Sequence, residues 1–140
     1  MCDTTTMTTR RDTPSSRNTS PAECAHDVDR VLATFHSAHC HVFPLDVDAP
    51  GDDAVRGLLT AVFTAFPDFQ FIAERTYHAD AAVVVEGRIT GTHDGDWAGV
   101  APTGRTVDVP MCCIYHFDEE GLTSESVHFD HATLLGQLNQ

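Results

Sequence analysis

Histidines and a cysteine gather in the segment HSAHCH, residues 36–41. Imidazole and thiol groups are zinc ligands, so a metal centre is one chemistry to consider here. His36 and His39 are three residues apart and would share one face of a helix. The next carboxylate, Asp46, comes only after a proline, and no paired motif follows elsewhere. Histidines near a helix end also interact well with its dipole. We therefore expect no metal at His36, His39 or His41, and no other cofactor.

A second stretch with chemical potential is GTHDGDWAGVAPTGR, residues 91–105, which holds His93 and the only tryptophan, Trp97. A hairpin reverses direction in about two to five residues, so this connection between two strand-like runs is unusually long. Its glycines let the backbone pass close to a ligand. We expect the segment to form a lip over a cavity, with Trp97 against an aromatic ligand. The alternative is that Trp97 closes one end of the core.

The elements that position these residues follow from the spacing of apolar side chains. A capping box at Ser20 and helical spacing after it predict a helix to about His39. HCHVFPLDVDAPG then breaks the pattern with two prolines and a glycine. A second helix is expected after Gly51, ending at Pro67. From residue 68 onward the period becomes two, which predicts strands at 69–79, 81–93, 105–117 and 122–129.

A last helix is expected over residues 130–138, capped by Asp130. Helices collected on one side of an antiparallel sheet make an α+β domain. A long twisted sheet that curls round helices forms a cone, and its hollow interior suits a small ligand.

Composition limits the possible partners. The net charge is −13, and none of the eight basic residues is lysine. Nucleic-acid binders need a basic surface, so we expect no nucleic acid, and no apolar run approaches the roughly 20 residues of a membrane helix. The five cysteines form no CxxC pair, which indicates reduced thiols in a cytoplasmic protein. Residues 1–20 are expected to be a disordered Thr/Ser-rich tail and residues 21–140 a single domain.

Four segments occur together in a characteristic order: FPDF at 66–69, GTHDGDWAGVAPTGRTV at 91–107, a glycine-containing turn at 118–121 and FDHATLLGQL at 129–138. In this order they resemble the SnoaL-like polyketide cyclases, a branch of the NTF2-like superfamily. The resemblance implies an NTF2-like cone, in which a curved antiparallel sheet wraps round N-terminal helices and a short C-terminal helix follows. Asn139 stands where the family usually has glycine, which points to a divergent member.

The resemblance also implies a reaction. In such cyclases a carboxylate at the last strand–helix junction, here Asp130, removes a proton next to a carbonyl, and the enolate attacks a second carbonyl in the same molecule. A free aspartate has a pKa of about 3.9, which makes it a weak base for this purpose. An apolar cone would raise that pKa through desolvation. The alternative is that Asp130 only caps the last helix.

An enolate needs a hydrogen-bond donor at its oxygen, and His116 and His93 are the candidates. Either histidine could instead be satisfied within the core or the loop. His128 shares the alternation of Asp130, and two tyrosines could lend hydroxyl groups to the pocket. The expected substrate-binding residues are Trp97, His128, Tyr115 and Tyr77.

We therefore expect a cofactor-independent polyketide (ester) cyclase that works on a small aromatic or polycarbonyl substrate and forms a homodimer or tetramer. A hydrolase or isomerase of the same fold, in which Asp130 and a histidine activate water or move a proton, is one alternative. The other is a non-catalytic domain that binds a small molecule. The surroundings of Asp130 and the presence of a hollow interior separate these alternatives.

Overall fold

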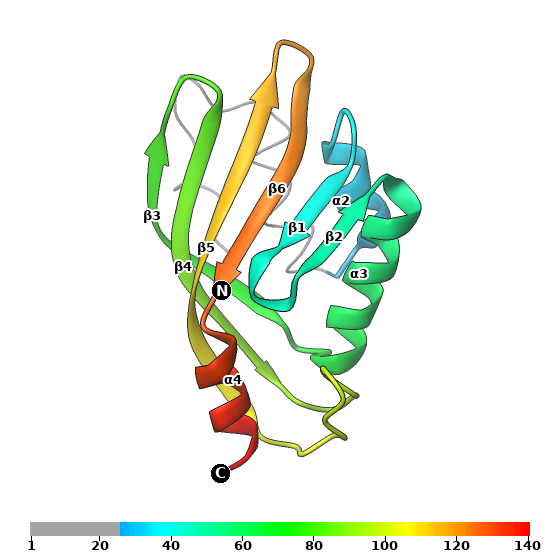
Figure 1. Cartoon of the computed structure of the whole chain (residues 1–140), viewed down its shortest axis with the longest axis vertical. Helices are drawn as coiled ribbons and strands as arrows, with labels where there is room; N and C mark the ends of the chain where they lie inside the picture. Colours follow the sequence, from blue (N-terminus) through cyan, green and yellow to red (C-terminus); the bar gives the residue numbers. More distant parts are fainter. Residues whose placement is uncertain (1–25) are drawn as a thin grey trace.

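The computed structural model describes residues 26–140, so the predicted tail and the capping box at Ser20 lie outside the described residues. Residues 26–140 form three α-helices and a six-stranded sheet (Figure 1). In chain order the elements are α2 (Val28–Thr34), β1 (His39–Val42), the 3-10 turn η2 (Phe43–Leu45), β2 (Val47–Pro50), α3 (Asp52–Ala65), β3 (Gln70–His78), β4 (Ala82–Thr92), β5 (Thr106–Asp118), β6 (Gly121–Phe129) and α4 (His131–Leu138).

The sheet has the strand order β2-β1-β6-β5-β4-β3. It curls, and α2 and α3 lie together on its inner side, with α3 against β1 and β2 (Figure 1). The α4 helix continues from the end of β6 and packs on β5. This arrangement confirms the predicted α+β fold with a curved sheet. The four predicted strands pair antiparallel, as expected, whereas β1, which was not predicted, runs parallel to β6.

The four long strands agree with the alternation of the sequence, since each lies within one residue of its expected bounds. Along β4 and β5, alternate side chains are buried, which is the pattern of strands with one face on a core. Val85, Val109 and Tyr115 are completely buried on this inner face. The opposite face of these strands is the outer face of the sheet.

The region between the two helices differs from the prediction. The first helix ends at Thr34 instead of His39, and Phe35 leaves it in an extended conformation. The segment expected to be irregular forms the β1–β2 hairpin, and Cys40 lies beside Glu125 of β6. This pairing joins residues 85 positions apart, which the local spacing of apolar residues does not encode.

The α3 helix forms where it was predicted. Asp52 and Asp53 occupy its first turn, where negative charge is stabilised by the helix dipole. Val55 and Ala65 are buried beneath it, and the helix ends just before Pro67, which cannot continue a helical hydrogen-bond ladder. None of the helices within residues 26–140 is both long and apolar enough to span a membrane.

Candidate functional site

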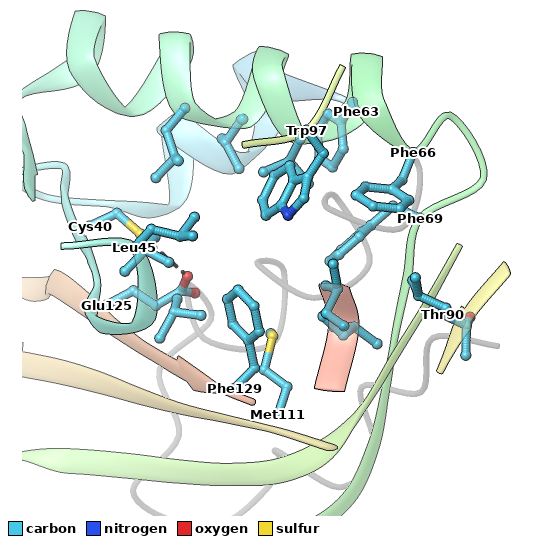
Figure 2. Close-up of a pocket in the computed structure, with 18 residues that line it drawn as sticks. Cys40, Leu45, Phe63, Phe66, Phe69, Thr90, Trp97, Met111, Glu125 and Phe129 are labelled. Atoms are coloured by element: carbon cyan, nitrogen blue, oxygen red, sulfur yellow. Dashed lines mark hydrogen bonds between the residues drawn. The ribbon is translucent and has the colours of Figure 1, made fainter. Parts of the chain in front are cut away.

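A cavity of about 90 Å³ lies between α3 and the inner face of the sheet (Figure 2). Residues of β1, α3, β4, β5, β6 and α4 contribute to its wall, which is almost entirely apolar. Five of the wall residues are aromatic: Phe63, Phe66, Phe69, Trp97 and Phe129. The interior is therefore hollow, as the cone predicted.

Glu125 on β6 brings a carboxyl group to this wall. It is only 8% exposed, and its Oε1 accepts a hydrogen bond from the Cys40 thiol at 3.8 Å. In Figure 2 the carboxyl lies near Leu45 and Phe129. Among the wall residues that the structure describes, it is the one carboxylate, and none carries a positive charge. A carboxylate is costly to bury in apolar surroundings, so its presence here points to a function.

Glu125 is not among the residues predicted from the sequence, although its strand carries a signal for it. In β6, Val127 and Phe129 lie two and four residues after Glu125 and share its face, while Ser124, Ser126 and His128 alternate with them. An acidic residue on the apolar face of an alternating strand is unusual. The inward-facing positions of β6 include Glu125 when they are counted back in steps of two from Phe129, and exclude it when they are counted from Asp130.

Asp130 lies in different surroundings from those predicted. It is exposed and caps α4, where its Oδ1 accepts from the Thr133 N–H at 3.0 Å and its Oδ2 from the Thr133 hydroxyl at 2.6 Å. The Thr133 hydroxyl and then its N–H hold the pKa of Asp130 below the ordinary value. The raised pKa expected for this carboxyl is therefore wrong, because an N-cap in water stabilises the charged form. The capping role is confirmed.

Asp130 borders an open hollow on the outer face of the sheet, together with His128 and Cys112. Phe129 and Leu134 contribute to the wall of the inner cavity, whereas Asp130 itself does not. The position that the resemblance marks as the base is thus next to the cavity in sequence and outside it in space.

His93 is completely buried and holds the 91–105 loop together. Its backbone N–H donates to the Arg105 carbonyl, and its own carbonyl accepts from Gly104, both at 2.8 Å. Its Nδ1 accepts from the Thr103 backbone N–H at 3.2 Å and lies 3.0 Å from the Thr103 hydroxyl. His93 is not among the residues of the cavity wall. The structure therefore gives it the loop-pinning position.

Trp97 does reach the cavity, as the lip prediction requires. Its ring meets Phe66 edge-on, with 5.5 Å between centroids, and its Nε1 donates to Nε2 of His131 at 3.3 Å. The tryptophan thus connects the end of α3 with the start of α4. At Gly95 the close approach is to the protein itself, because the loop passes against the last turn of α3. A Cβ on Gly95 would lie 2.4 Å from the Thr64 carbonyl oxygen.

The remaining predicted residues are scattered. His116 Nε2 lies 3.2 Å from the Ser126 hydroxyl, on the outer face of the sheet. His128 is exposed and stacks on Phe43. Tyr77 is 47% exposed on β3, and Tyr115 is fully buried beneath the sheet without reaching the cavity wall. The structure gathers none of these four at the cavity.

The residues of HSAHCH also diverge. His36 pairs with Glu120 at 2.7 Å and His39 with Asp48 at 2.5 Å, and His41 stacks on Phe43 at the surface. Cys40 turns inward to Glu125. Within residues 26–140, no three histidine, cysteine or acidic side chains come together in a way that could hold a metal ion.

A family model described as "SnoaL-like polyketide cyclase" matches residues 19–138. No curated protein sequence matches the chain.

Several solved structures have the same fold. AclR of Streptomyces galilaeus, whose assignment as a hydroxylase is provisional, is 21% identical over 89% of this chain and 78% of its own, with a TM-score of 0.75. IdmH of Streptomyces antibioticus, provisionally a polyketide cyclase, is 20% identical over 90% of this chain and 96% of its own, with a TM-score of 0.70. A protein of Catenulispora acidiphila with a ketosteroid isomerase-like fold, solved with trimethylamine, is 15% identical over 94% of this chain and 95% of its own, with a TM-score of 0.78. At these identities the likeness shows a shared fold.

Proposed function

Because the chain belongs to the SnoaL-like polyketide cyclase family, we propose that it is a cofactor-free enzyme that closes a ring within an uncharged carbonyl compound by an aldol-type step. The observation that carries this proposal is the buried Glu125 carboxyl at the wall of an apolar cavity. Intramolecular ring closure asks for one base, a hydrogen-bond donor for the enolate oxygen and a cavity that folds the substrate into a reactive shape. Glu125 and the cavity support the first and the last of these, and the Cys40 thiol and Thr90 hydroxyl are donors among the wall residues.

The proposed step uses Glu125 as the base. Its carboxylate takes a proton from the carbon next to one carbonyl group, and the resulting enolate attacks the second carbonyl of the same molecule. The alkoxide that forms takes the proton back from Glu125, so one carbon–carbon bond is made and the carboxylate is regenerated. A carboxylate in apolar surroundings is a stronger base than one in water, since desolvation disfavours its charged form. The wall around Glu125 supports this role.

Asp130 is the competing candidate for the base, because it occupies the family position. Its exposed cap geometry and lowered pKa speak against it, because the hydrogen bonds from Thr133 already stabilise its charge. In this alternative the substrate would occupy the outer hollow beside His128. The two carboxylates can be separated by matched substitutions.

We expect Glu125→Gln to lower kcat/KM by at least about 100-fold, the usual contribution of a general base. Asp130→Asn should leave kcat/KM within about threefold. The probe is heptane-2,6-dione, which closes to a hydroxy ketone; loss of water then gives a cyclohexenone that is followed by ultraviolet absorbance. Circular dichroism checks that both variants fold. The reverse pattern would transfer the role of base to Asp130. Two fully active variants would remove both carboxylates from the mechanism.

The hydrolase or isomerase alternative makes a different prediction for the same variants. Exchange of the protons next to a single carbonyl, followed by NMR in deuterated water with cyclohexanone, needs the base but no second carbonyl group. Exchange that depends on Glu125 without ring closure of the diketone would favour an isomerase. If neither reaction occurs, the cavity is a binding site alone.

A further inference from the structure

The cavity combines aromatic rings with one acidic group, and this combination suits a positive ligand. Five aromatic side chains line it: Phe63, Phe66, Phe69, Trp97 and Phe129. The face of an aromatic ring carries negative electrostatic potential and attracts organic cations, and cages of such rings bind quaternary ammonium groups. The aromatic wall therefore provides more than a hydrophobic lining.

The charges of the site favour a cation over an anion. The Glu125 carboxyl belongs to the wall, and no arginine or histidine is among the described residues that line it. The whole chain contains no lysine and carries a net charge of −13, so the surrounding potential attracts cations and repels anions. A ligand with a positive charge would pair with Glu125 in a water-poor setting, where such a pair is strong.

The size of the cavity limits the ligand. At about 90 Å³ it is well below the roughly 300–1,000 Å³ of ordinary small-molecule sites. A headgroup that carries its charge on a methylated nitrogen is compact, and its methyl groups can contact the leucine and phenylalanine side chains. We infer that this cavity binds small alkylammonium ions, with the methylated nitrogen among the aromatic rings and its charge paired with Glu125. This inference rests on the wall of the cavity and not on the proposed reaction.

Choline and its uncharged isostere 3,3-dimethylbutan-1-ol test the inference, because they differ in the charge and not in the shape. We expect choline to bind at least about tenfold more tightly by isothermal titration calorimetry at constant ionic strength. Trp97 is the only tryptophan and lines the cavity, so its fluorescence should change with the same dissociation constant. Binding of both compounds with equal affinity, or of neither, would overturn the inference.

Three variants locate the site. Glu125→Gln should remove the preference for choline, and Phe69→Leu should weaken choline binding while leaving the neutral isostere nearly unchanged. Asp130→Asn, which alters an exposed carboxylate outside the cavity, is the matched control and should keep the preference. If Asp130→Asn loses choline binding, or if Glu125→Gln keeps the preference for choline, the binding would be assigned to the acidic surface of the chain.

The two proposals can fail separately. Choline binding without ring closure of the diketone would support the cation site and reject the cyclase reaction. Ring closure that depends on Glu125, without a preference for choline, would support the cyclase reaction and reject the cation site. If both hold, choline should be a competitive inhibitor of the ring closure.

Discussion

Asp68 ties the start of β3 to the end of β4. Its Oδ1 accepts from the Thr92 N–H at 2.6 Å and its Oδ2 from the Thr92 hydroxyl at 2.7 Å. The Thr92 hydroxyl, and after it the Thr92 N–H, lower the pKa of Asp68. A lowered folded-state pKa stabilises the protein above the unfolded value of about 3.9, and this contribution is lost as the pH falls through the folded-state pKa. Because Asp68 is exposed, its contribution to the stability is modest.

We therefore expect Asp68→Asn to lower the melting temperature by a few degrees at pH 7. The difference from the wild type should shrink below about pH 4, where the carboxylate of the wild type takes up its proton. Thermal melts followed by circular dichroism between pH 3 and pH 7 would show this. Asp96 lies in the 91–105 loop and has no hydrogen bonds like those of Asp68 to Thr92. Asp96→Asn should therefore have no such pH-dependent effect. A difference that is constant with pH would contradict the role given to the carboxylate.

Asp130 and Glu125 show what a sequence can predict about single residues. Asp130 was correctly predicted as an N-cap, since capping is a local property of the residue and its next three positions. Its chemical role depends on which side of the sheet it faces, and that is set by the turn out of β6. Glu125 lies on the apolar side, where the alternation of the strand could have revealed it. The approach of Cys40 could not have been predicted, because β1 itself was not.

The 91–105 loop is held to α3 by backbone contacts. The N–H groups of Asp94 and Gly95 donate to the Ala65 carbonyl at 2.9 and 3.1 Å, which satisfies a carbonyl at the end of the helix. This approach leaves no room for a Cβ on Gly95. The position of Trp97 over the cavity depends on this close contact.

We expect Gly95→Ala to destabilise the fold by about 1–3 kcal/mol, since the backbone of Thr64 must move away from the added methyl group. Gly57→Ala in α3 is the matched control: nothing lies within 4 Å of the added methyl group, and it should stabilise the helix by about 0.5–1 kcal/mol. Urea denaturation measures both. The change at Gly95 should also shift the emission of Trp97. Equal stabilities of the two variants would show that the loop adapts freely.

The elements that the sequence predicted are those with long, regular patterns. The α3 helix and the strands β3 to β6 each repeat a period over several turns or alternations. In contrast, β1 and β2 have four residues each, and Pro44 and Pro50 interrupt this segment. β2 pairs with β1, and β1 pairs with β6, far along the chain. That pairing is what brings Cys40 into the cavity wall.

The sheet has two unlike faces. The inner face is covered by α2 and α3, whereas no helix of the described residues lies over the outer face of β3, β4 and β5 (Figure 1). Tyr77, Val84 and Ile114 stand in one row across these strands. They are only partly buried, and Tyr77 is 47% exposed. Such a row on an uncovered sheet suits contact with a second copy of the chain.

We accordingly expect a homodimer with the outer faces of two sheets packed together, and a mass near twice the 15.2 kDa of one chain in sedimentation velocity experiments. Ile114→Glu would place a new negative charge at the middle of this contact on both copies, where two like charges meet in a dry setting. It should weaken the dimer at least about tenfold. Thr64→Glu, at an exposed site on α3, adds the same charge away from the sheet and should leave the dimer intact. A wild-type protein that sediments as one chain would reject the dimer, and a dimer that tolerates Ile114→Glu would place its interface elsewhere.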